Sequence, residues 1–68
     1  MMMSTVCLRM TDGREVWFRA PQHEVNRLVI TRHGKEGYSE EEKDHLIFTE
    51  KKVPITVDLS RIREILIT

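Results

Sequence analysis

The sequence predicts an all-β domain, mainly antiparallel, in which five to six short strands form a small barrel. Two observations lead to this prediction. Residues 53–59 alternate apolar with polar side chains, and most of the apolar ones are β-branched, which is typical of a strand with one buried face. Earlier in the chain, Asp12 and Gly13 separate two strand-like runs, which is a strong hairpin signal. With 68 residues there is room for a single domain, residues 1–68.

The first hairpin is predicted to join the strand-like runs on either side of Gly13. A two-residue loop would place Arg9 opposite Val16 and so mix charge with the core. A three-residue loop ending at Gly13, with that glycine in the left-handed conformation, keeps one face apolar. We therefore expect the three-residue loop, which gives the pairs Val6 with Phe18, Cys7 with Trp17, and Leu8 with Val16.

The segment after this hairpin has two interpretations. Pro21 makes a corner, because proline cannot donate to a strand ladder. The apolar run Leu28 to Ile30 then favours a third strand over residues 25–31. The alternative is a short helix near residues 21–28 with Pro21 in its first turn, which would make the fold α+β.

A long acidic loop follows at residues 33–44, where the sequence has two glycines and no aliphatic side chain, and we expect it to be flexible. The fourth strand, residues 45–49, is predicted to turn through residues 50–52 into the strand at 53–59. A turn of two or four residues places Leu46 opposite Val57 by parity, and Phe48 opposite Ile55.

The end of the chain reads as a strand, one short helical turn and a second short strand. Residues 60–63 interrupt the alternation for about one turn, after which Ile65 and Ile67 resume it. This order of short strands is similar to that of SH3-like or Sm-like barrels. The similarity concerns architecture alone and does not indicate a function. The predicted core comprises Val6, Leu8, Val16, Phe18, Leu28, Ile30, Leu46, Phe48, Ile55, Val57 and Ile62.

Composition limits the classes of function. Eleven Lys and Arg against eleven Asp and Glu give no net charge, which argues against a general binder of nucleic acid or anionic membranes. Cys7 is the only cysteine, so no internal disulfide can form and a cytoplasmic location is expected. The first residues lack the basic and apolar runs of a signal peptide or a spanning helix, so no membrane association is expected.

No motif for catalysis is present. His23, His33 and His45, together with Cys7, have none of the short spacings that prepare a metal site. No glycine-rich phosphate loop occurs, and Ser39 and Ser60 are better explained as a cap and a turn residue. We therefore expect a protein that is not an enzyme and has no cofactor, no bound metal and no small-molecule substrate.

A second apolar face is the main functional signal. The chosen registers put Cys7, Trp17, Val29 and Ile47 on the side opposite the core, where a solvated sheet would be polar, and Leu66 is a further candidate for this face. Either these side chains turn inward at the strand ends, or they form a contact patch in which a tryptophan lies beside arginine, as in interface hot spots. The second interpretation predicts a binding or regulatory module that contacts a protein partner or its own copy. The expected partner-binding residues are Cys7, Arg9, Trp17, Arg19, Val29 and Ile47.

The alternative function is binding of single-stranded nucleic acid. Residues 1–32 hold five arginines against three carboxylates, and Trp17 lies between Glu15 and Arg19 as a candidate stacking platform. The interspersed carboxylates and the acidic loop weigh against this function. Its expected residues are Arg9, Trp17, Arg19, Arg27 and Arg32.

Overall fold

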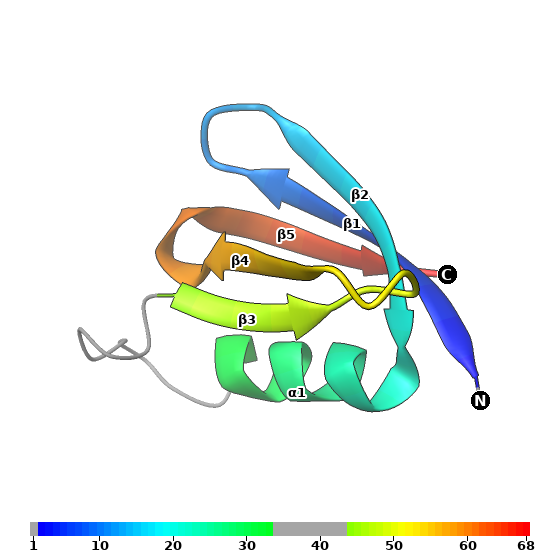
Figure 1. Ribbon diagram of the computed structural model, residues 1–68. Coiled ribbons are helices and arrows are strands. Elements are labelled where there is room, and N and C mark those ends of the chain that lie inside the picture. The colour runs from blue at the N-terminus through cyan, green and yellow to red at the C-terminus, as the bar shows by residue number, and fades with distance from the viewer. Residues whose placement is uncertain (1, 34–43) are drawn as a thin grey trace.

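The computed structural model describes residues 2–33 and 44–68. Most of the predicted acidic loop at residues 33–44 lies outside these residues. The described chain forms five strands, one helix and a single 3-10 turn (Figure 1). In order they are β1 (Met3–Met10), β2 (Glu15–Pro21), α1 (Gln22–His33), β3 (Asp44–Phe48), β4 (Pro54–Asp58), the 3-10 turn (Leu59–Arg61) and β5 (Ile62–Ile67).

β1 is the central strand of a three-stranded antiparallel sheet with the order β2-β1-β5. The predicted hairpin register is confirmed, since Val6 pairs with Phe18 and Cys7 with Trp17. Gly13 has a φ of 90°, a left-handed conformation that strains any residue with a Cβ. Its N–H donates to the carbonyl of Met10 at 3.1 Å, which closes the three-residue loop.

α1 occupies the segment for which the sequence favours a third strand, so that prediction is wrong and the helical alternative is correct as to type. Pro21, however, is the last residue of β2 and not part of the first helical turn, which begins at Gln22. The helix continues to His33, well past the predicted end at residue 28. Val25 and Leu28, three residues apart, are buried, whereas Ile30 is 69% exposed. A strand would have put Leu28 and Ile30 on the same face, but a helix turns them apart. The three-residue apolar run fitted both structures, and the spacing of Val25 and Leu28 is the helical signal.

β3 and β4 form a separate antiparallel hairpin in which Ile47 pairs with Ile55 and His45 with Val57. The predicted register is wrong by one residue, because the connection from Phe48 to Pro54 contains five residues and an odd number reverses the parity. As a result Ile47 is fully buried, while Leu46 is 46% exposed and Phe48 is also exposed. Lys52, with a φ of 60°, lies in this five-residue turn.

The predicted strand, turn and strand at the end of the chain are confirmed as β4, the 3-10 turn and β5. Asp58 caps the turn by accepting a hydrogen bond from the Ser60 N–H at 3.0 Å. Leu59 fills the space beneath the turn and is buried. β5 then pairs with β1 and so returns the end of the chain to the first strand.

The core lies between the three-stranded sheet, the β3–β4 hairpin and α1, which runs beneath the hairpin in Figure 1. Phe18 and Ile55 are only partly buried against this core, and Val16, Ile30, Leu46 and Phe48 are exposed, contrary to prediction. Five predicted core residues are buried as expected: Val6, Leu8, Leu28, Val57 and Ile62. Five more were not predicted: Cys7, Ala20, Val25, Ile47 and Leu59.

The domain is mostly antiparallel β structure, but its described strands form two sheets and not one closed barrel. A single main-chain hydrogen bond connects β2 with the β3–β4 turn, from the Glu50 N–H to the Arg19 carbonyl at 2.8 Å. No helix in the described part of the chain has the length and apolar character needed to cross a bilayer.

Candidate protein-binding surface

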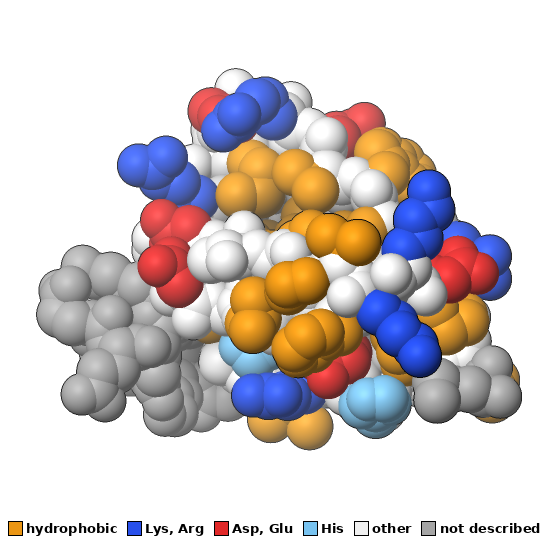
Figure 2. Space-filling view, in the orientation of Figure 1, with side chains coloured by type: hydrophobic (Ala, Val, Ile, Leu, Met, Phe, Trp, Pro, Cys, Tyr) orange, Lys and Arg blue, Asp and Glu red, His pale blue; other side chains and the backbone are white. Residues whose placement is uncertain are grey.

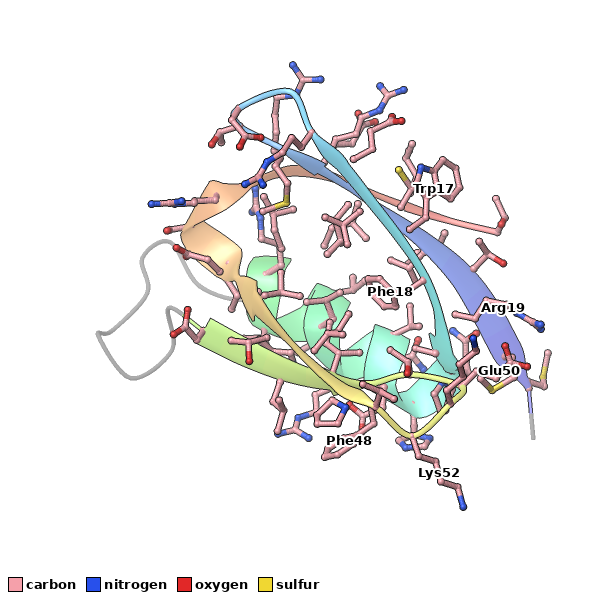
Figure 3. The ribbon with its side chains drawn as sticks, turned by 45° about the horizontal axis from the view of Figure 1, so that its top comes forward. Trp17, Phe18, Arg19, Phe48, Glu50 and Lys52 are labelled. Carbon is pink, nitrogen blue, oxygen red and sulfur yellow. The ribbon has the colours of Figure 1, made fainter. Side chains whose placement is uncertain are left out.

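The face of the three-stranded sheet that points away from the core is centred on Trp17. Side chains alternate between the two faces of a strand. The side chains of Val16 and Phe18 are on the core side of the sheet, so the side chain of Trp17, between them, points away from the core. The Trp17 indole is 62% exposed, and Figure 3 shows it on the outside of β2 while Phe18 points inward. We define the outer face as Cys7, Arg9, Glu15, Trp17, Arg19, Glu64 and Leu66.

Cys7 is at the centre of the outer face and is nonetheless buried. It pairs with Trp17 on one side and Leu66 on the other, and it does not belong to the core cluster. Its cover therefore comes from neighbours on the outer face. Burial raises the pKa of the thiol, and the Glu15 carboxylate raises it further. A thiol held in its protonated form is a weak nucleophile, which makes Cys7 a packing residue.

Charged side chains around Trp17 are largely paired. Arg9 Nε donates to Glu15 Oε2 at 3.2 Å, and Arg9 Nη1 to Glu64 Oε2 at 3.4 Å. The hydrogen bond that Arg9 donates to Glu15 and the negative charge of Glu64 raise the pKa of Arg9. On the other side of Trp17, Arg19 Nη1 donates to the Glu50 carboxylate at 3.3 Å. The indole is thus bordered by polar pairs of near-zero net charge, as in the rim of an interface.

Two of the predicted partner-binding residues do not belong to this surface. Ile47 lies within the core, because the register of the β3–β4 hairpin turns it inward, so its assignment to an exposed patch is wrong. Val29 is half-buried on α1, and a helix replaces the strand that would have carried it. The other four predicted residues share the outer face, namely Cys7, Arg9, Trp17 and Arg19. Cys7 is buried beneath its neighbours, so its assignment as a partner-binding residue is wrong, and Arg9, Trp17 and Arg19 remain accessible.

The arginines named for nucleic-acid binding are divided in the same way. Arg9 and Arg19 lie on either side of Trp17, but Arg27 and Arg32 project from α1. Arg32 Nη2 donates to the carbonyl of Ile62 at 3.1 Å and so holds the helix to β5. The five arginines therefore do not form one basic surface, and the two beside Trp17 are paired with carboxylates.

A feature that the sequence did not predict is a cleft between the edge of β2 and β4. We call it the β2–β4 cleft; it has a volume of about 250 Å³. It explains why Val16 is 40% exposed although its side chain is on the core side of the sheet. Its lining residues are Leu8, Met10, Arg14, Val16, Ile55, Thr56, Val57 and Asp58.

A second hollow lies where the β3–β4 turn meets β2, with a volume of about 330 Å³. We call it the turn hollow; it is lined by Trp17, Phe18, Arg19, Thr49, Glu50 and Lys51. Figure 3 shows Glu50 beside Arg19 at this junction. Figure 2 shows hydrophobic side chains gathered over the middle of the face that carries β2 and the β3–β4 hairpin. No local sequence signal relates the turn to β2, because the contact between Arg19 and Glu50 joins residues that are 31 positions apart.

A third groove, of about 570 Å³, lies at the start of α1. Its lining is mainly apolar and includes Met3, Pro21 and Phe48. The Glu24 side chain also lines it and is largely buried; its Oε1 is 3.6 Å from His23 Nε2. Within the residues that the structure describes, no three His, Cys, Asp or Glu side chains are grouped so that they could hold a metal ion.

Comparison with known proteins found no match: no protein-family model, no curated protein and no solved structure matches the chain.

Proposed function

We propose that the chain is a small binding or regulatory module that contacts a protein partner, or its own copy, through the outer face around Trp17. The observation that carries the proposal is the exposure of Trp17 on a regular strand, fixed by pairing on one side to the central strand. An indole held in this way is a rigid apolar contact that loses little conformational entropy on binding.

Energetics support the same function. Burying a large apolar side chain contributes roughly 1.5–3 kcal/mol, which is a sizeable fraction of the free energy of unfolding of a domain of this size. Leu66 lies on the same face, 36% exposed, at the other side of Cys7. A contact that covers both side chains would be bordered by the Arg9 and Arg19 ion pairs, which exclude water from its edge.

The SH3-like architecture and the cytoplasmic location that the sequence predicts are also part of this proposal. The order β5-β1-β2, followed by β3–β4 and a 3-10 turn into β5, supports an SH3-like architecture that is open between β2 and β4. A single buried cysteine with a raised pKa is compatible with the cytoplasm, where thiols stay reduced.

The test uses Trp17 as its own reporter, because it is the only tryptophan of the chain. Light scattering and Trp17 emission are measured over a dilution series of the purified chain, and a pull-down from cell extract depleted of this protein then compares the unmodified chain with its variants. We expect a blue shift of the emission when the chain associates, and Trp17→Ala should abolish the association while Ile30→Ala, an exposed residue on α1, leaves it unchanged. Association that is equally strong in Trp17→Ala would contradict the proposal.

Binding of single-stranded nucleic acid is the alternative, and the exposed indole between Arg9 and Arg19 is what supports it. Both arginines would have to leave their carboxylates to contact a phosphate backbone. Titration of the chain with oligothymidylate at low salt distinguishes the two functions. Quenching of Trp17 that weakens as salt increases would favour nucleic acid, and unchanged emission would remove this alternative.

A further inference from the structure

We propose that the partner contributes an extended segment that adds as a strand to the free edge of β2 at Trp17, with an acidic residue at the Lys51 end. This inference rests on the proposed function and specifies the partner's conformation and charge.

The free edge of β2 follows from the direction of its main-chain hydrogen bonds. The Met10 N–H donates to the Arg14 carbonyl at 2.8 Å, so every second residue from Arg14 onward points its main chain toward β1. Val16 and Phe18 belong to that set. Trp17 and Arg19 point the other way, as the bond from the Glu50 N–H to the Arg19 carbonyl shows.

In the described chain, that bond is the only main-chain bond on this side of β2, because β2 is an outer strand of the sheet order β2-β1-β5. The N–H and carbonyl of Trp17 therefore remain available for a further strand. Glu50 already makes the first contact of such a ladder at the Arg19 end. An open edge of this kind binds extended peptides, with the main chain giving affinity and alternate side chains giving specificity.

The surroundings of the edge accept side chains of the added strand. On one side of that strand, alternate residues would enter the β2–β4 cleft beside Val16 and Ile55. On the other side, they would lie next to the exposed indole of Trp17. Because the cleft is small and most of its lining side chains are apolar, we expect β-branched or aliphatic side chains at the positions that face it.

The charge near Lys51 indicates which residue the partner's segment carries at that end. Lys51 lines the turn hollow, and among residues 2–33 and 44–68 neither Lys51 nor Lys52 forms an ion pair. Arg19 is neutralised by Glu50 in the same hollow. The excess charge at the turn end of the edge is therefore positive, which favours Asp, Glu or a terminal carboxylate in the partner.

The experiment selects ligands from a displayed library of random peptides and then modifies the best one chemically. We expect alternating aliphatic residues with Asp or Glu at one end of the segment. Methylating the main-chain nitrogens that face β2 should weaken binding about tenfold, whereas methylating the intervening nitrogens, which point away from β2, is the matched control and should have little effect. The Trp17 amide should exchange with solvent more slowly in the complex.

The outcomes separate this inference from the proposed function. Peptides that shift Trp17 emission but tolerate methylation at every nitrogen would overturn strand addition and leave the outer face as a contact surface. Peptides whose affinity does not change in Trp17→Ala would count against both. Lys51→Glu should weaken binding of the acidic peptide about tenfold and Lys52→Glu less, because Lys52 lines the groove at the start of α1 instead. The inference would be overturned if the two substitutions had equal effects. It would also be overturned if the library gave a helical ligand or no ligand, or if the chain bound only a second copy of itself.

Discussion

Leu46 and Ile47 are neighbours in β3 with opposite environments. Ile47 is fully buried in the core, whereas Leu46 is largely exposed. Ile47→Ala should lower the free energy of unfolding by about 2–5 kcal/mol, because it leaves a cavity. Leu46→Ala should cost less than about 1 kcal/mol. Urea denaturation of the two variants measures this difference, and the opposite order would restore the register predicted from the sequence.

The burial of Cys7 by its neighbours on the outer face can be tested by the reactivity of its thiol. Labelling by a thiol reagent near pH 8 should be slow, because the thiol is buried and its pKa is raised by burial and by Glu15. Trp17→Ala removes a cross-strand neighbour and should speed labelling. Val16→Ala alters the opposite side of β2 and serves as the control. Rapid labelling of the unmodified chain would show that the outer face does not cover Cys7.

Single residues also show how far the sequence could predict the surface. Cys7, Arg9, Trp17 and Arg19 were correctly assigned to one face, because the loop at Gly13 determines their register over a short distance. The position of Ile47 depends on whether the turn before Pro54 has an odd or even number of residues, and turn composition does not determine that parity.

At the scale of elements, α1 is the largest departure from expectation. The helix separates Leu28, which is buried, from Ile30, which is exposed. Leu28→Ala should therefore cost about 2–5 kcal/mol. Ile30→Ala should be nearly neutral or slightly stabilising, because alanine has the higher helix propensity. Equal destabilisation of both variants in thermal or urea unfolding would indicate a strand with both residues on one face.

Local sequence could not decide this element, because an apolar run of three residues fits a buried strand as well as a helix. The hairpin and the final strand, turn and strand were predictable, because each depends on turn chemistry or alternation within a few residues. The β2–β4 cleft was not, since it lies between the first hairpin and β4, which are far apart in the sequence.

For the whole molecule, His45 makes stability depend on pH. Burial lowers its pKa, and the charge of Arg27 lowers it further, against an opposing contribution from Glu24. The unfolded chain therefore binds a proton near pH 6.5, before the folded chain does, so stability should fall as the pH decreases from about 7 to 5. His45→Gln should flatten this dependence in urea titrations. His23→Gln, which changes an exposed imidazole, is the control, and the same slope in both variants would contradict the assignment.

The open edge of β2 is the central claim about the whole molecule, and amide hydrogen exchange of the free monomer measured by NMR tests it most directly. Val16 and Phe18 direct their N–H groups toward β1 and should exchange slowly. Trp17, between them, directs its N–H away from the sheet and should exchange orders of magnitude faster. Protection of Trp17 equal to that of Val16 and Phe18 would mean that β2 is paired on both sides, as in a closed barrel, and would contradict the open edge.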